Sequence, residues 1–260
     1  MRLDGCEASG QGRPGDADHR AVSLNQPEVV ADEYATERGL ETRRLVYADA
    51  DGPDPNVVLW ELLCAAQPRA VLEVGPGPGE LSARIARELG ADVVAIDVSE
   101  RMVELGRSRG VDSRLGDVQS LPFPAGSFDV VVAAWMLYHV PDLDRGLSEV
   151  ERVLVPGGRL IAVTNSERHL DEARALAGAS MVGRVPFSRE NGADVLLRHF
   201  ADVVRHDVDV WVVFPDADAV RRYLRSSILM REAADRVPEL HAPLRAGSRT
   251  TVFIATKSTA

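Results

Sequence analysis

The sequence predicts an α/β fold built on a doubly wound, largely parallel sheet. Short apolar runs without alternation, as in strands buried on both faces, recur between segments with helical apolar spacing. The first such run, 70–74, breaks into a turn with Gly75, Gly77 and Gly79, and helical spacing resumes from Leu81. A glycine-rich turn between a buried strand and a helix is where a doubly wound sheet holds its cofactor.

Length and charge narrow the possible functions. The 260 residues and 28.2 kDa suit one large α/β domain better than two full ones. A net charge of −10 and a pI near 5.1 weigh against a broad nucleic-acid-binding surface. No apolar stretch reaches membrane-spanning length. We therefore expect no membrane segment and consider nucleic acid an improbable partner.

The cysteines and the first residues bear on the compartment. Cys6 and Cys64 make neither a disulfide framework nor a metal site, which favours a reducing cytoplasm. Residues 1–20 are polar and lack the apolar region of a secretory signal, so we expect a disordered tail. The rest, 21–260, is predicted to form a single domain.

The elements ahead of the glycine-rich turn are predicted to cap the core. From Pro27 to about Tyr47 the pattern is helical, with a break at Gly39. Asn56 is a plausible cap for a helix over 57–66, which leads to the first strand. We divide the domain into N-terminal cap helices (21–66), a cofactor-binding core (67–165) and a C-terminal half with lid helices and the last two strands (166–260).

The chemistry of the turn separates several cofactors. A dinucleotide fingerprint needs a small residue where this chain has Glu80, and Pro76 and Pro78 cannot donate the N–H groups that a phosphate needs. Glu73 would repel a pyrophosphate and suits a ligand that carries positive charge. S-adenosylmethionine, with its sulfonium and ammonium groups, is such a ligand.

The next two strands supply carboxylates at their carboxyl ends. A strand over 91–96 ends at Asp97, and Ser99 caps a helix over 100–108. In a doubly wound sheet the Asp97 carboxylate is placed to accept both ribose hydroxyls; the alternative is a simple helix cap. The third strand, 111–115, leads into Gly116 and Asp117.

The rest of the chain completes the sheet. A strand over 130–134 leads to a helix that begins at Asp142 or Asp144, and a Pro-Gly-Gly turn starts the fifth strand. Further along the chain, we expect helices over 167–177, 190–199 and 216–230. We expect strands over 203–214 and 251–255, the last of them terminal.

Three segments carry a resemblance to a known family. Residues 73–79 resemble the E/D-x-G-x-G-x-G first motif of class I S-adenosylmethionine-dependent methyltransferases. Residues 116–123 resemble the G-D-A-x-x-L-P-F segment of the same superfamily, and 137–161 look like the type 11 methyltransferase family. The resemblance covers roughly 71–165. It implies a Rossmann-like, seven-stranded sheet with an antiparallel C-terminal strand.

The resemblance also implies which residues bind the cofactor. There the carboxylate of Asp117 takes a hydrogen bond from the adenine amino group, although a turn aspartate is the alternative. The residues carried over to the S-adenosylmethionine site are Glu73, Gly75, Pro76, Gly77, Gly79, Asp97, Val98, Met102, Gly116, Asp117, Val118, Ala134 and Trp135.

Catalysis and the acceptor are less constrained. His139 has the ordinary pKa of a general base near neutrality, but it could equally pack or bind adenosine at the strand tip. The pattern indicates no catalytic triad and no metal ligand cluster. The predicted substrate pocket contains Tyr34, Met136, Tyr138 and Asn165; Arg43 and Arg44 could touch ligand or stay solvated.

The acceptor is predicted to be a small organic molecule methylated on oxygen, nitrogen or carbon. The [DNS]-P-P-[YFW] motif of base-amino methyltransferases is absent after the fourth strand, where the chain reads Ala134 to Leu137. The alternatives are a methyltransferase for RNA or another macromolecule, an NAD-type oxidoreductase, and a non-catalytic cofactor-binding module. The oligomeric state does not follow from the sequence.

Overall fold

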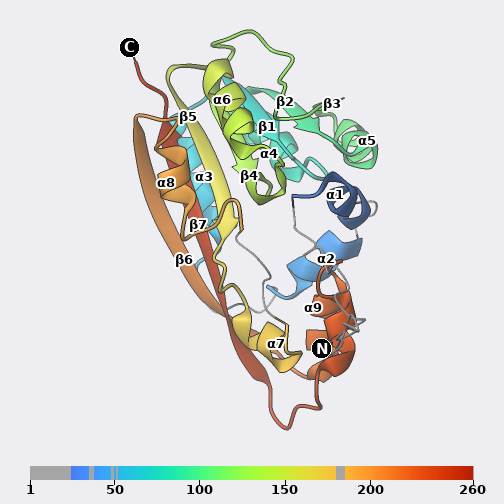
Figure 1. Cartoon of the computed structure of the whole chain (residues 1–260). Helices are drawn as coiled ribbons and strands as arrows, with labels where there is room; N and C mark the ends of the chain where they lie inside the picture. The colour runs from blue at the N-terminus through green and yellow to red at the C-terminus, as the bar shows by residue number, and fades with distance from the viewer. Residues whose placement is uncertain (1–24, 35–37, 48–49, 51, 180–184, 260) are drawn as a thin grey trace, which may run out of the picture.

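A computed structural model describes residues 25–34, 38–47, 50, 52–179 and 185–259. Its centre is a seven-stranded sheet of order β3-β2-β1-β4-β5-β7-β6 (Figure 1). The strands are β1 (Ala70–Val74), β2 (Asp92–Asp97), β3 (Asp112–Leu115), β4 (Phe128–Ala134), β5 (Leu154–Asn165), β6 (Asp202–Phe214) and β7 (Leu244–Thr256). The first five are parallel, and β7 inserts antiparallel between β5 and β6. The predicted fold is confirmed, and the predicted tail at 1–20 lies outside the described residues.

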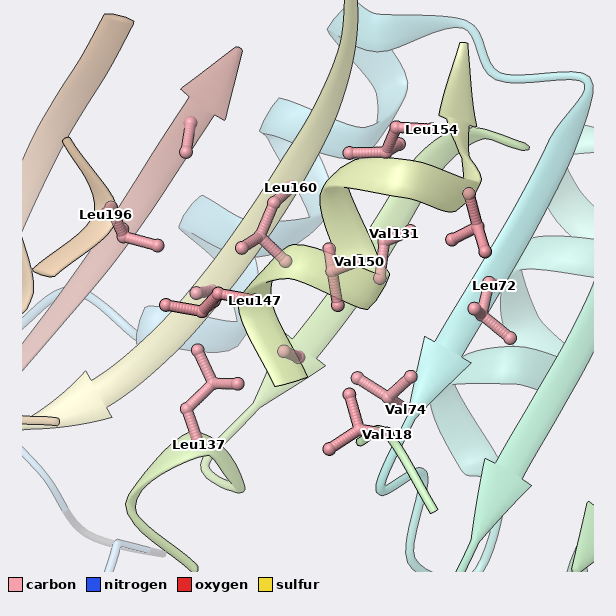
Figure 2. Close-up of a cluster of buried hydrophobic side chains, with 14 of the residues drawn as sticks. Leu72, Val74, Val118, Val131, Leu137, Leu147, Val150, Leu154, Leu160 and Leu196 are labelled. Carbon is pink, nitrogen blue, oxygen red and sulfur yellow. The ribbon is translucent and has the colours of Figure 1, made fainter. Parts of the chain in front are cut away.

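Helices cover both faces of the parallel half of the sheet. On one face, Leu147 and Val150 of α6 (Leu143–Val153) pack over Leu72, Val131 and Leu160 (Figure 2). The other face is covered by α3 (Pro55–Ala66) and α4 (Glu80–Leu89). The central strands are buried on both sides for this reason, as their unbroken apolar runs predict. The remaining helix of this half is α5 (Glu100–Ser108).

The β6–β7 pair extends well past the rest of the sheet. The last residue of β5, Asn165, pairs with Thr250, while β7 continues to pair with β6 as far as Leu244. On this extension Val212 and Phe214 pack against α9 (Ala217–Arg225). The extension therefore forms a second, smaller core beside the sheet.

The helices around this second core come from both ends of the chain. They are α1 (Pro27–Glu33), α2 (Arg38–Leu45), α7 (Asp171–Leu176), α9 and the 3₁₀ helix η2 (Arg231–Arg236), with α8 (Gly192–Leu196) at the other end of β6. Figure 1 shows α1, α2 and α9 stacked along one side of the molecule, and α2 packs against α9. The N-terminal segment thus lies over the carboxyl ends of the strands.

Several predicted boundaries in the N-terminal half change. The cap of α3 is Asp54, whose carboxylate accepts from the Asn56 N–H; Asn56 lies inside the helix because Pro55 already suits its first turn. Gly39 lies within α2, so it does not break the helix. Asp142 caps α6 by accepting from the Arg145 N–H, as one of the two predicted alternatives required.

In the C-terminal half the strands are longer and the helices shorter than predicted. Pro156, Gly157 and Gly158 lie inside β5 at a shift of register against β4, and the positive φ of Gly157 (74°) permits this bulge. The terminal strand, β7, starts at Leu244 rather than at the predicted Thr251. The first half of β7 pairs with β6 alone, beyond the end of β5. Helices α7, α8 and α9 span only part of the ranges that their apolar spacing predicts.

Candidate functional site

A cavity of about 1490 Å³ opens where β1, β2, β4 and β5 end. Its volume exceeds the roughly 300–1,000 Å³ of an ordinary small-molecule pocket. One lobe, here called the cofactor lobe, lies at the glycine-rich turn, Asp97 and Asp117; the second, the acceptor lobe, lies between the N-terminal helices, Asn165 and α9. The cavity is therefore large enough for two ligands side by side.

The glycine-rich turn is shaped by a close approach of the segment after β4. Gly75 and Gly77 have φ values of 63° and 55°, which only glycine adopts without strain. A Cβ at Gly75 would lie 2.8 Å from the Cβ of Met136. The Gly75 N–H donates to the carbonyl of Ile96 at 2.8 Å. The turn thus lines the cavity with main chain.

The third glycine of the motif has a different task from the first two. Gly79 does not line the cavity; it precedes α4 with a φ of 79°, and a Cβ there would lie 2.9 Å from the Cα of Gly106 in α5. Two glycines therefore let α4 and α5 approach each other. Glu80, next in sequence, lies at the rim, and its ion pair with Arg44 (2.7 Å) ties α4 to α2.

Glu73 ends β1 with its carboxyl group buried. Ser82 of α4 donates a hydrogen bond to it, yet burial raises its pKa to about 7. Because a cation next to this carboxyl would favour its charged form, the site is suited to a positively charged ligand. This geometry agrees with the role predicted for Glu73, which stays a prediction.

Asp97 lies at the end of β2, held by two main-chain donors. The Ser99 N–H donates to Oδ1 at 2.9 Å and the Gly77 N–H to Oδ2 at 3.3 Å. Burial nevertheless raises its pKa to about 6. The cap of α5 is Ser99 rather than Asp97, whose carboxylate holds the turn before the helix and faces the cavity. Its predicted role as the ribose acceptor stays a prediction.

The segment that is predicted to bind adenine also lines the cavity, but Asp117 is already engaged. Gln119 donates to both of its carboxylate oxygens, through N at 2.9 Å and Nε2 at 2.8 Å. Next to it Val118 is buried, and Met102 of α5 lines the same space. An adenine ring would therefore meet apolar walls here, with Asp117 held at the rim. Gly116 and Val98 also line this part of the cavity.

Trp135, directly after β4, has a strained backbone. Its φ of 54° is rare for a residue with a Cβ and marks functional sites more often than ordinary turns. The indole N–H donates to Oδ1 of Asn165 at 3.1 Å, and Thr250 donates to the same oxygen at 3.0 Å. Ala134, Met136 and Tyr138 line the cavity beside it. The ends of β4 and β5 thus meet the middle of β7 at the boundary of the two lobes.

His139 lies in the 3₁₀ helix η1 (Leu137–His139) and meets the N-terminal segment. Its Nε2 is 2.8 Å from the hydroxyl of Tyr34, whose pKa is raised to about 12 by burial. The Tyr138 ring lies on its other side, with 4.4 Å between ring centroids. The structure therefore brings together three of the residues predicted for catalysis and substrate binding.

A second phenol–imidazole pair escaped the sequence analysis. The hydroxyl of Tyr47 lies 2.8 Å from Nε2 of His169, which is buried, and burial lowers the pKa of this histidine to about 4. His169 follows β5 in the segment where motifs fade, and Leu170 after it has a φ of 53°. Only the strained turn, invisible in the sequence, distinguishes this histidine from others.

Arg43 also lines the cavity, where it joins the N-terminal helices to α9. Its guanidinium is paired with Glu33 and donates to the carbonyl of Ser226 at 3.1 Å. The second carboxylate oxygen of Glu33 accepts from the Ile228 N–H at 2.8 Å. This pair fastens α1 and α2 to the end of α9, and Arg43 lines the cavity whereas Arg44 reaches Glu80.

The described part of the chain contains neither a metal-binding cluster nor a membrane-spanning helix. Among the described residues, no group of His, Cys, Asp and Glu could hold a metal ion. In the same part of the chain, no helix is long and apolar enough to cross a membrane.

The fold and this site define a class of protein: an α/β enzyme fold with a nucleoside-type cofactor site at the strand ends. A family model described as a methyltransferase domain matches residues 72–162. A demethylmenaquinone methyltransferase of Symbiobacterium thermophilum is 38% identical over 107 residues, which cover 37% of this chain and 43% of that protein. A ubiquinone biosynthesis O-methyltransferase of Xanthomonas oryzae is 38% identical over 152 residues, 53% of this chain and 63% of that one.

Solved structures agree on the fold. A protein described as the [4+2]-cyclase SpnF superposes with a TM-score of 0.60 at 20% identity, covering 91% of this chain and 97% of that one. The family match and these relatives support a class I S-adenosylmethionine-dependent methyltransferase domain of type 11 over residues 72–162. It spans about two fifths of the length of the first quinone-pathway relatives it matches.

Proposed function

We propose that the protein is a methyltransferase that uses S-adenosylmethionine to methylate an oxygen, nitrogen or carbon atom of a small organic acceptor. The observation that supports this most is one cavity with two lobes, in which the glycine-rich turn and the segment 116–118 line the first lobe. The named relatives act in quinone biosynthesis, which agrees with a small acceptor.

The residues of the cofactor lobe fit the proposed cofactor. Glu73 and Asp97 are buried carboxyl groups with raised pKa values, so a cationic ligand would gain from their charged forms. Pro76 and Pro78 offer no phosphate donors in the turn. A ribose diol would find a two-oxygen acceptor in Asp97, and an adenine ring would lie against Met102 and Val118.

When bound, the cofactor supplies an activated methyl group, so the protein's own task is to position the acceptor and exclude water. Trp135 and Asn165 fix the boundary between the lobes through their hydrogen bond. The Tyr34–His139 pair is placed to take a proton from an acceptor, with His139 as the base. This role of His139 is part of the proposal.

Calorimetry with S-adenosylhomocysteine tests the cofactor assignment. We expect binding at micromolar or lower concentration, and tight binding of NADH in its place would contradict the proposal and support an oxidoreductase. A cell extract incubated with methyl-labelled S-adenosylmethionine should then yield a labelled small molecule. Label found only in RNA or protein would favour a macromolecular acceptor, and cofactor binding without any product would favour a non-catalytic module.

Two further expectations stay predictions. The cytoplasm is predicted from the two cysteines, of which Cys64 is free. The division into cap (21–66), core (67–165) and lid half (166–260) awaits dissection of the chain.

A further inference from the structure

The acceptor lobe contains every tyrosine of the chain. The sequence has four, and Tyr34, Tyr47, Tyr138 and Tyr223 all line the cavity. They come from the N-terminal segment, η1 and α9, so no local pattern gathers them. A lobe lined in this way presents aromatic faces together with hydroxyl groups to its ligand.

Two of these hydroxyls have no hydrogen-bond partner in the part of the chain that the structure describes. Tyr34 and Tyr47 bond to histidines, but no described residue forms a hydrogen bond with the hydroxyl of Tyr138 or Tyr223. Burial raises the pKa values of Tyr138 and Tyr223, so both stay protonated and able to donate. Neither hydroxyl is among the fully buried atoms that lack a partner, so both are accessible from the cavity, where a ligand oxygen can accept from them.

Positive charge lies among the same tyrosines. Burial raises the pKa of each of the four phenols, whereas the positive charge of Arg43 lowers each of these pKa values. Its Nη2 is buried and without a hydrogen-bond partner. Arg174 also lines the lobe, and its charge lowers the pKa of Tyr223. Its Nε is buried and has no hydrogen-bond partner among the described residues.

The carboxylates near these groups are already used, including Glu167 of the cavity lining, which accepts from the Ser188 hydroxyl at 3.3 Å. Glu33 pairs with Arg43 and accepts from Ile228, while Asp171 pairs with Arg174 from a half-exposed position. The carboxyl group of Asp97 belongs to the cofactor lobe, although it acts weakly on Tyr34. The unused polar groups of the tyrosines and arginines can therefore all donate a hydrogen bond, and the guanidinium groups carry positive charge, which disfavours an ammonium acceptor despite the aromatic rings.

Resting on the proposed function, we propose that the acceptor is a phenol or enol with an acidic hydroxyl, bound as its oxyanion in the lobe that Arg43, Tyr138 and Tyr223 surround. On binding, the O–H bond breaks, the proton passes to solvent or to His139, and the electron pair stays on the ligand oxygen. The oxygen then accepts hydrogen bonds from the two free phenols next to the guanidinium charge. The acceptor would thereby become a nucleophile before it meets the methyl group.

The probe for this proposal is alizarin, a dihydroxyanthraquinone whose absorption moves to longer wavelength when a hydroxyl ionises. Protein saturated with S-adenosylhomocysteine, as checked by calorimetry, leaves only the acceptor lobe open to the dye. We expect the pKa of the bound dye to fall by about 1 unit or more, as expected for an acid beside an opposite charge. The smaller 4-nitrophenol serves as a second probe.

Conservative variants identify the groups responsible. Tyr138→Phe and Tyr223→Phe should each weaken dye binding about tenfold or more and reduce the spectral shift, because each removes a donor to a charged oxygen. Since Arg43→Gln alone would leave Glu33 buried and unpaired, the Glu33→Gln and Arg43→Gln double variant is used to remove the charge. Arg225→Lys, on the exposed face of the Tyr223 helix, is the matched control and should bind like the parent.

The outcomes separate this proposal from the proposed function. Loss of S-adenosylhomocysteine binding by the parent protein would contradict the function itself. With that binding intact, failure of both dyes to bind, binding in the neutral form, or tighter binding of tetramethylammonium would overturn the oxyanion proposal. Unchanged spectra in all three substituted variants would also overturn it.

Discussion

The two lobes of the cavity are built in opposite ways. Almost every residue of the cofactor lobe lies between Glu73 and Trp135, on turns that directly follow β1, β2, β3 and β4. The acceptor lobe draws on segments from α1 to β7, joined by pairs such as Tyr34 with His139 and Tyr47 with His169, which are 105 and 122 residues apart. A lobe built from consecutive turns can carry a sequence motif, whereas a lobe assembled from distant segments cannot.

This difference explains which parts of the site could be predicted. The parallel sheet followed from buried strands and the glycine-rich turn, whereas the antiparallel last strand and most of the predicted cofactor residues came from the family resemblance. These residues line the cavity apart from Gly79, and their role in binding stays a prediction. Gly79 is the exception, since a glycine that packs helices looks the same in sequence as one that lines a turn. His169 and Tyr223 gained their places from the β6–β7 extension and the N-terminal helices, and their local sequence gives no sign of it. Arg43 lines the cavity, which was one of its two predicted alternatives.

The largest effect is expected in the cofactor lobe, from Asp97→Asn. Loss of the charged acceptor for the ribose hydroxyls should weaken S-adenosylhomocysteine binding about 100-fold in calorimetry. The free energy of unfolding should instead be higher in the variant. Burial raises the pKa of Asp97 to about 6, so ionisation of this carboxyl destabilises the folded parent as the pH rises from about 4 through 6. The variant should accordingly melt higher than the parent at pH 8.

Asp112→Ala is the control for that experiment, since Asp112 pairs with Arg114 at the exposed start of β3, away from the cavity. Equal affinities of the parent and the Asp97→Asn protein would remove Asp97 from the cofactor site.

The next effect concerns the close approach at the glycine-rich turn. Gly75→Ala and Gly90→Ala both place a Cβ at positive φ, 63° and 67°, at a cost of about 1 kcal/mol each. Only at Gly75 does the new Cβ collide, 2.8 Å from Met136, whereas nothing lies within 4 Å at Gly90. We expect Gly75→Ala to cost a further 1–3 kcal/mol, roughly, in urea unfolding and to weaken cofactor binding.

If the two alanine variants unfold at the same urea concentration and bind S-adenosylhomocysteine alike, the packing of Met136 against the turn is not what requires glycine there.

A smaller effect should appear as a pH dependence specific to the charged cofactor. The raised pKa of Glu73, about 7, means that its carboxyl is mostly neutral below that pH and charged above it. Affinity for the sulfonium of S-adenosylmethionine should therefore rise with pH, about tenfold from pH 5.5 to 8, relative to S-adenosylhomocysteine, whose sulfur is neutral. The ratio cancels effects of pH on the rest of the site. A ratio that stays flat across this range, or falls, would mean that Glu73 does not sense the sulfonium.

The smallest effect belongs to the acceptor lobe and tests whether the two lobes are separable. Tyr47→Phe removes the hydroxyl bonded to His169, and Tyr34→Phe the one bonded to His139, so each should lower the free energy of unfolding by about 0.5–1.5 kcal/mol. Because the Tyr47 hydroxyl bonds to His169, after β5, and not to the glycine-rich turn, its variant should bind S-adenosylhomocysteine within about twofold of the parent. A larger loss for Tyr47→Phe would show that closure of the N-terminal helices is coupled to cofactor binding. In that case the lobes, although built separately in the sequence, would act as one site.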